Sequence, residues 1–255
     1  MNSILVVEKA VYLVKRVLLL GGNGFIGKNL KEYLSVRNDI AIDAPSSKEL
    51  NLLDEISVYQ YLSQTHFDVV INAAVCNRLR SSANMDKSEI EQDLRMYFNL
   101  EKYSDLYGKM LYFGSGAEYD KTKDICSVKE TDLPHGIPTT EYGLAKYVIG
   151  QHIEKSDNIY NFRIFGLFGK YENWRTTFIS GACCKALKGV PITIRQNTVF
   201  DYLYIDDFCK AVEWFIDNTP VYHTYNVTSG QRIDLLTIAE TILEISGANV
   251  PIYVC

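Results

Sequence analysis

The stretch "RVLLLGGNGFIGKNL" (residues 16–30) decides the fold. It begins with a short apolar run that ends at glycines, which is typical of a buried parallel strand. The segment 23–36 that follows has apolar residues at helical spacing. Gly21, Gly24 and Gly27 therefore lie between a predicted strand and a predicted helix.

This glycine triplet has the spacing of a turn that binds a dinucleotide. One glycine permits the tight turn, one lets the backbone approach a pyrophosphate, and one lets the helix pack close to the strand. The free N–H groups and the positive dipole end of the helix would face the diphosphate. A simple strand-to-helix turn is the alternative, but the triplet follows the first strand of an alternating pattern, which disfavours it.

The rest of the chain continues this alternation. Further strands are predicted at 39–44, 67–75, 109–116 and 159–169, and helices at 54–64, 87–107 and 140–156. Alternating strands and helices predict an α/β protein with a Rossmann-like, doubly wound parallel sheet. We expect a dinucleotide-binding domain over 1–169 and, over most of 170–255, a small C-terminal substrate-binding lobe. Residues 223–229 are expected to return to the main sheet, and the sequence leaves open whether the lobe is complete at its C-terminus.

The composition limits the classes of partner. The chain has 255 residues, 47% of them hydrophobic and 22% charged, with a net charge of −5. A polyanion would be repelled, so no nucleic-acid partner is expected. The six cysteines form no C-x-x-C pair and the four histidines do not cluster with them, so no metal site is expected.

Apolar runs are too short for a membrane protein. No run of about 18 apolar residues is present, so we expect neither a transmembrane helix nor a membrane partner. The apolar start of the chain is broken by charged residues and lacks a small-residue cleavage site, which argues against a signal peptide. A cytoplasmic location is the default expectation.

A tyrosine and a lysine, Tyr142 and Lys146, share one face of the helix predicted over 140–156. Such a pair can donate and stabilise a proton in an active site. With 18 tyrosines in the chain, about one such pair arises by chance, and a second copy occurs at Tyr119 and Lys123. The spacing alone therefore does not decide between catalysis and a tyrosine that covers the core.

The motifs "GGNGFIG", "FGSGAEY", "YGLAK" and "YIDD" together resemble the extended short-chain dehydrogenase/reductases, the NAD-dependent epimerase/dehydratase family. The resemblance runs from about Lys15 to about Gly247. Within the family, "KELNLLDEISVYQYLSQTHFDVVINAA" is most similar to the nucleotide-sugar reductases of the GDP-fucose synthase branch.

The resemblance implies three catalytic residues, Ser115, Tyr142 and Lys146. The family's serine lies four residues before a tyrosine that marks a strand end, as Ser115 lies before Tyr119, so the spacing from Tyr119 to Lys123 is accidental. Ser115 would hydrogen-bond a sugar carbonyl and Tyr142 would give or take its proton. A free tyrosine has a pKa near 10, so Lys146 and an oxidised nicotinamide would stabilise the phenolate. Lys146 would also hold the nicotinamide ribose.

The cofactor is expected to be NAD or NADP. The predicted cofactor contacts outside the second strand are Gly21, Gly24, Phe25, Ile26, Gly27, Asn51, Leu52, Ala73, Ala74, Lys146 and Phe165. Asp43, 22 residues after Gly21, favours NAD because an acidic residue there binds the ribose hydroxyls. Ser46, Ser47 and Lys48 could hold a 2′-phosphate instead. These signals conflict, and we favour NADP(H) slightly.

Departures from the family pattern narrow the reaction. Gly116 and Ala117 stand where the dehydratases have an acidic pair, which argues against dehydration. Ala117 also stands at the position of the fucose synthases' cysteine, and Arg175 at that of their histidine, so epimerisation beside the carbonyl loses its acid and base. Phe200 replaces an arginine that binds the diphosphate.

The substrate contacts are the least specific part of the prediction. The predicted substrate contacts are Asn173, Arg175 and Arg195. The missing arginine could be replaced by Arg175, Arg195 or Lys185. An ordinary surface role for any one of these residues agrees equally well with the sequence. We predict reduction of a nucleotide-linked 4-keto-6-deoxyhexose in the synthesis of a surface-polysaccharide sugar. A nucleotide-sugar 4-epimerase and a non-catalytic dinucleotide-binding protein are the alternatives. The family also implies a homodimer formed through 87–107 and 140–156.

Overall fold

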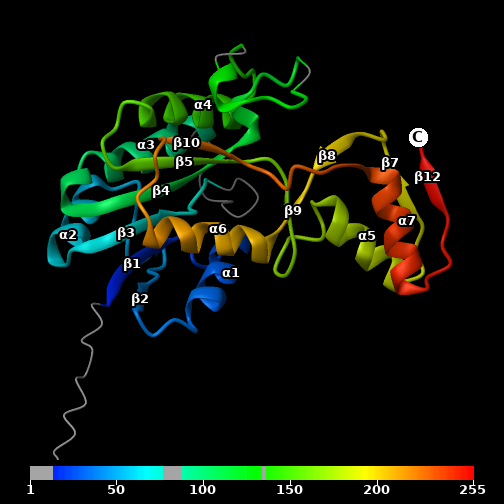
Figure 1. Cartoon of the computed structure of the whole chain (residues 1–255), viewed down its shortest axis with the longest axis horizontal. Helices are drawn as coiled ribbons and strands as arrows, with labels where there is room; N and C mark the ends of the chain where they lie inside the picture. Colours follow the sequence, from blue (N-terminus) through cyan, green and yellow to red (C-terminus); the bar gives the residue numbers. More distant parts are fainter. Residues whose placement is uncertain (1–13, 77–87, 124, 134–135) are drawn as a thin grey trace, which may run out of the picture.

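The computed structural model describes residues 14–76, 88–123, 125–133 and 136–255 (Figure 1). The segment 1–13 lies outside these ranges, and with it most of the stretch on which the signal-peptide prediction rests.

A six-stranded parallel sheet forms the main body. Its strands in spatial order are β2 (Ile40–Asp43), β1 (Lys15–Leu20), β3 (Phe67–Asn72), β4 (Tyr107–Ser115), β5 (Ile159–Ile164) and β10 (Thr224–Val227). Because all of these pairs are parallel, the carboxyl ends of the strands meet at one edge. The strand order changes direction between β1 and β3, and ligands bind at such switch points in open α/β sheets.

Helices cover both faces of the sheet (Figure 1). α1 (Phe25–Leu34) and α6 (Ile205–Asp217) pack on one face, and α2 (Glu55–Gln64), α3 (Glu89–Glu101) and α4 (Glu141–Ile153) pack on the other. Each face of the sheet has its own hydrophobic core, and alternate residues of β1 belong to one or the other. Val17 and Leu19 belong to the core under α1 and α6, and Leu18 and Leu20 to the core under α2, α3 and α4. The predicted Rossmann-like doubly wound sheet is confirmed.

The remaining elements form a smaller lobe, at the right of Figure 1. Its core lies between α5 (Phe178–Leu187), α7 (Leu235–Ser246) and two strands that pair in parallel, β7 (Ile192–Ile194) and β12 (Ile252–Val254). β8 (Val199–Asp201) pairs antiparallel with β11 (Arg232–Asp234). α6 and β10 lie in the lobe's half of the sequence but pack with the main sheet, so the chain crosses between the two parts more than once.

The two largest differences from the sequence-based prediction lie at the ends of one helix and one strand. The helix expected to continue to residue 107 ends at Glu101, and a 3₁₀ turn, η1 (Ser104–Leu106), precedes β4. The side chain of Asn158 donates to the carbonyl oxygens of Ser104 and Tyr107 and stabilises this turn. The strand expected over 159–169 ends at Ile164; β6 (Leu167–Phe168) then pairs with β9 (Leu203–Tyr204).

Within the described residues, every helix is too short or too polar to cross a membrane. The same residues contain no group of three or more histidine, cysteine, aspartate or glutamate side chains that could hold a metal ion.

Candidate active site

The glycine turn lies at the carboxyl end of β1, where its three glycines have different surroundings. Gly21 has a φ of +76°, and a Cβ there would lie 2.6 Å from the carbonyl oxygen of Ala73. A Cβ on Gly27 would lie 2.7 Å from the Cα of Gly22, so helix α1 can pack this closely only without a side chain. A Cβ on Gly24 would meet only the oxygen of Gly21, at 3.3 Å. The structure therefore has open space beside Gly24, whereas Gly21 and Gly27 are packed tightly against backbone atoms.

Gly24 is also the N-cap residue immediately before α1, and it supplies no side-chain cap to this helix. The first N–H groups of a helix have no partner within it. The N–H groups of Phe25, Ile26 and Gly27 belong to this first turn, next to Gly24 and at the positive end of the helix dipole. This arrangement fits the diphosphate of a dinucleotide.

The residues predicted to select between NAD and NADP already have partners. The carboxylate of Asp43, at the end of β2, accepts a hydrogen bond of 2.9 Å from the hydroxyl of Tyr61. The backbone N–H and the hydroxyl of Ser46 both donate to Oε2 of Glu49, at 2.8 Å each. Glu49 therefore occupies the donors that we assigned to a 2′-phosphate. Ser47 and Lys48 are exposed beside them.

The other predicted cofactor contacts are divided between the site and the core. Ala73 and Ala74 follow β3 directly and lie against Gly21. Phe165 follows β5, and its ring lies beside Gly116, where a Cβ would approach to 2.8 Å. Leu52 is only 8% exposed and belongs to the core between the sheet and α2, so it could contribute backbone atoms but little side chain. Asn51 is exposed beside it.

Ser115 and Tyr142 meet at the carboxyl end of β4. Ser115 is the last residue of this strand and begins a 3₁₀ turn, η2 (Gly116–Glu118). Tyr142 lies in the first turn of α4, which Thr140 caps by accepting from the N–H of Gly143 at 3.1 Å. Burial raises the pKa of Tyr142, and a hydrogen bond with Ser115 acts against this increase. A hydroxyl that keeps its proton at neutral pH can act as a general acid.

Lys146 lies one helical turn after Tyr142 and is only 1% exposed. Its Nζ donates to the hydroxyl of Tyr112 at 2.9 Å and to the carbonyl oxygen of Phe113 at 2.8 Å, and it lies 5.7 Å from the centre of the Tyr142 ring. Burial lowers the pKa of Lys146 to about 8, although the negative charges of Asp93 and Glu118 oppose this. The ammonium form therefore predominates at neutral pH.

Three buried residues of this site were missed by the sequence-based prediction: Tyr112, Asp93 and Glu118. Asp93, on α3, is 5% exposed; its Oδ1 accepts from the N–H of Cys76, and its Oδ2 has no hydrogen-bond partner among the described residues. Glu118 is fully buried three residues after Ser115. Spacing could have suggested Glu118 because it follows the serine in the motif, but nothing local indicates its burial. Tyr112 lies 34 residues from Lys146, too far for a helical or strand period to connect them.

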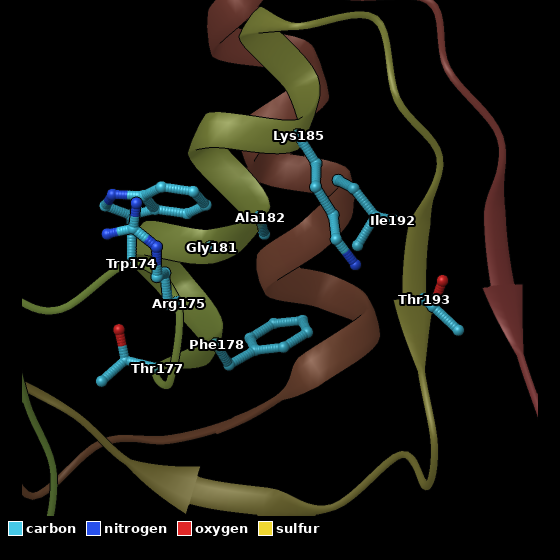
Figure 2. A pocket seen from close by; sticks show the side chains of 9 residues that line it. All are labelled: Trp174, Arg175, Thr177, Phe178, Gly181, Ala182, Lys185, Ile192 and Thr193. Carbon is cyan, nitrogen blue, oxygen red and sulfur yellow. The ribbon is translucent and has the colours of Figure 1, made fainter. Parts of the chain in front are cut away.

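The smaller lobe contains a hollow, which none of Ser115, Tyr142 and Lys146 lines (Figure 2). The loop before α5, α5 itself and β7 line it, with Arg175, Phe178, Lys185 and Ile192 among its side chains. It adjoins a larger hollow of about 640 Å³ that Trp174, Arg175 and Lys185 also line. The guanidinium of Arg175 lies 4.3 Å from the centre of the Trp174 ring. The exposed indole of Trp174 and the cationic side chains of Arg175 and Lys185 thus lie on one surface.

Of the three predicted substrate contacts, the structure places one in this hollow and the other two outside it. Arg175 lines the hollow, and so does Lys185. The side chain of Asn173 accepts from the N–H of Arg175 at 3.2 Å and shapes the loop instead. Arg195 is exposed just after β7 and does not line either hollow. Phe200, at the position of the family's arginine, is 45% exposed and its ring lies beside that of Tyr202.

Comparison with known proteins identifies the family. Residues 17–228 match the model of the NAD dependent epimerase/dehydratase family. The chain belongs to this family. The resemblance predicted from the motifs is therefore confirmed. The matched range, 17–228, includes the glycine turn, the end of the strand at Ser115 and the helix of Tyr142.

Relatives of known function are distant but align over most of the chain. GDP-L-colitose synthase of Yersinia pseudotuberculosis is 22% identical over 254 residues, covering 91% of this chain and 82% of the relative. GDP-L-fucose synthase of Escherichia coli is 23% identical over 264 residues, with the same two shares. A solved GDP-mannoheptose C4 reductase from Campylobacter jejuni, with NADP bound, has a TM-score of 0.82 at 17% identity and covers 95% of this chain and 88% of its own. That structural likeness shows the shared fold.

Proposed function

We propose that this protein is an NAD(P)H-dependent reductase of a nucleotide-linked 4-keto-6-deoxyhexose, acting in the synthesis of a surface-polysaccharide sugar. The observation that carries the proposal is the placement of Tyr142 one helical turn before buried Lys146, whose Nζ lies 5.7 Å from the centre of the Tyr142 ring, with Ser115 beside them at the carboxyl end of β4. These groups lie at the same edge of the sheet as the glycine turn, because the carboxyl ends of β1 and β4 are on one side.

The three side chains divide the work of carbonyl reduction. Bound reduced nicotinamide would supply the hydride. Ser115 would donate its hydroxyl hydrogen to the keto oxygen and orient it, which frees Tyr142 to approach the same oxygen. Tyr142 would then protonate that oxygen as negative charge develops on it, and the ammonium of Lys146 would stabilise the phenolate left behind. Lys146 can do this at neutral pH because its pKa, about 8, keeps it charged.

The surroundings of Ser115 support reduction over elimination. Neither Gly116 nor Ala117 has an ionisable side chain. Glu118 follows them, but its carboxylate is fully buried and paired with Arg163 at 2.6 Å, so it cannot reach a substrate. Hydride transfer with protonation of one oxygen needs no further acid or base, and this is what the remaining groups can perform.

We propose that the nucleotide part of the substrate binds the hollow of the smaller lobe. The exposed ring of Trp174 could stack on a base, while Arg175 and Lys185 could neutralise a diphosphate. Two of the relatives above are named as synthases of GDP-linked sugars, which is compatible with a nucleotide in this position. Phe200 adds an apolar surface where the family pattern has a charge.

We favour NADP(H) as the cofactor, with Ser46, Ser47 and Lys48 as the 2′-phosphate contacts. Binding would require Glu49 to release the two donors of Ser46. Asp43 is held by Tyr61, which makes it less available to a ribose. A homodimer formed through α3 and α4, which pack side by side, remains our prediction for the assembly; sedimentation at several concentrations would test it.

The decisive experiment is turnover of a panel of nucleotide-linked 4-keto sugars and nucleotide sugars with NADH and NADPH. We expect stoichiometric oxidation of reduced cofactor with a 4-keto substrate and a product two mass units heavier. Interconversion of nucleotide sugars without net cofactor consumption would indicate a 4-epimerase instead. Binding of dinucleotide without turnover of any member would support the non-catalytic alternative.

A further inference from the structure

A buried carboxylate lies directly behind the serine of the active site. Oε1 of Glu118 accepts from the backbone N–H of Ser115 at 3.2 Å, and Oε2 accepts from Nε of Arg163 at 2.6 Å. Nδ2 of Asn161 lies 3.1 Å from both carboxylate oxygens. Glu118 and Arg163 are 0% and 1% exposed. The carboxylate thus joins the end of β4 to β5.

Two glycines make room for this carboxylate. A Cβ on Gly114, in β4, would collide with both Glu118 and Asn161. A Cβ on Gly150, in α4, would lie 3.1 Å from Cδ of Glu118 and closer to its oxygen. Helix α4 therefore rests on Glu118 at Gly150, one turn beyond Lys146. Any shift of this side chain would displace Ser115 relative to the helix of Tyr142.

The local arrangement is costly to maintain. Burial raises the pKa of Glu118, and Arg163 and Asn161 act against it. The Oδ1 of Asn161 is buried without a hydrogen-bond partner among the described residues. Replacing such a buried ion pair by apolar residues is often neutral or stabilising, so its presence is weak evidence for a stabilising role. A role in the site accounts for it better.

We propose that Glu118 is a positioning residue of the active site: its buried carboxylate fixes the Ser115 turn against the helix that carries Tyr142 and Lys146, and it places a negative charge beneath that pair. Its part in catalysis rests on the reductase function proposed above, whereas its effect on Lys146 can be measured without a substrate.

The charge of Glu118 acts together with its neighbours. Among the residues that the structure describes, the titratable and charged groups around Tyr142 and Lys146 are Glu89 and Asp93 on α3, Tyr112 on β4, Glu118 on η2, Arg163 on β5 and Glu141 on α4. Asp93 and Glu118 both raise the pKa of Lys146, and both also raise that of Tyr142. Removing the charge of Glu118 should therefore lower both pKa values.

Glu118→Gln tests this role, because the amide keeps an oxygen that can accept from Ser115 but loses the charge. We expect kcat to fall roughly 10- to 100-fold, as expected for a misplaced reacting group, with cofactor affinity unchanged. In NMR titrations of protein labelled at lysine, the pKa of Lys146, assigned with Lys146→Met, should fall below that of the wild type. Glu240→Gln, at an exposed glutamate of α7, removes the same formal charge and should change neither quantity.

If Glu118→Gln does not fold, the double variant Glu118→Gln with Arg163→Gln removes the unpaired cation. Its kcat should fall as far, and the pKa of Lys146 should still fall but by less, because the loss of the cation offsets part of the lost negative charge. A folded variant with wild-type turnover and an unchanged Lys146 titration would overturn the proposal. So would a loss of turnover that follows only the fraction of unfolded protein, again with Lys146 unchanged. If the titration shifts but the wild type reduces no nucleotide sugar, the positioning effect stands and the reductase function fails.

Discussion

Replacing Tyr142 by phenylalanine separates the chemistry of the site from its packing. The variant keeps the ring, whose centre lies 5.7 Å from Nζ of Lys146, and removes only the hydroxyl beside Ser115. General acid catalysis contributes about 10²–10⁴ in rate, so kcat should fall by that factor. Cofactor affinity should stay close to the wild type because the glycine turn is untouched. Stopped-flow or steady-state oxidation of NADPH measures the first quantity, and isothermal titration the second.

Tyr119 supplies the matched control, because it belongs to the second tyrosine–lysine pair of the sequence. Its side chain is fully buried, and its hydroxyl lies 3.0 Å from the carbonyl oxygen of Lys129 and 3.0 Å from Oδ1 of Asn226. Tyr119→Phe leaves these acceptors without a donor, which costs about 1–3 kcal/mol. For a chain of this size the melting temperature should fall by roughly 2–10 °C, while turnover changes little.

The two variants should therefore show opposite effects: lost turnover with normal melting for Tyr142→Phe, and lower melting with retained turnover for Tyr119→Phe. Circular dichroism melts and turnover rates on the same preparations give both readings. Comparable losses of turnover in the two variants, or a larger loss at Tyr119, would refute the assignment of the proton donor.

Three further changes test other parts of the site. Gly24→Val should fold normally yet lose dinucleotide binding. Gly27→Val should also lower the melting temperature, because a Cβ there would lie 2.7 Å from the Cα of Gly22, whereas a Cβ on Gly24 meets backbone only at 3.3 Å. Normal binding by a folded Gly24→Val would mean that the loop is only a turn. Reduction should be fastest below about pH 8 and should slow at higher pH as Lys146 loses its proton, because burial lowers the pKa of Lys146 to about 8. A pH profile of kcat that stays level to pH 10 would contradict this expectation. Glu49→Ala should increase NADPH affinity relative to NADH severalfold, because it removes the acceptor that occupies the donors of Ser46. An unchanged ratio in paired titrations would place the 2′-phosphate elsewhere.

The main sheet and the glycine turn could be predicted from sequence because their signals are local. Gly21, Gly24 and Gly27 lie within seven residues, and the apolar periods of strands and helices repeat over short windows. The lobe was harder to delimit. The helix over 205–217 is clearly amphipathic, but a pattern cannot say which surface its apolar side covers, and in the structure it packs on the main sheet beside α1.

Long-range polar partners explain most of what sequence could not show. Glu118 and Arg163 are 45 residues apart, and an isolated glutamate in a sequence is far more often exposed than buried. The side chain of Asn158, which fixes the start of β4, lies 51 residues from Tyr107. For Ser46 the prediction considered an incoming phosphate but not the carboxylate of Glu49 three residues later.

The energetics of Lys146 connect the fold to the chemistry. Its pKa falls from 10.5 to about 8, and each unit corresponds to about 1.4 kcal/mol, so holding this ammonium in the protein costs about 3 kcal/mol at neutral pH. The hydrogen bonds that Lys146 donates to Tyr112 and Phe113 offset part of this cost. Because the folded pKa is lower than the unfolded one, the penalty is complete below about pH 8 and disappears as pH rises towards 10.5. A leucine would pack in the same place without this penalty. A charge kept in the core at such a cost, one helical turn from a tyrosine that keeps its proton, is better explained by proton transfer than by folding.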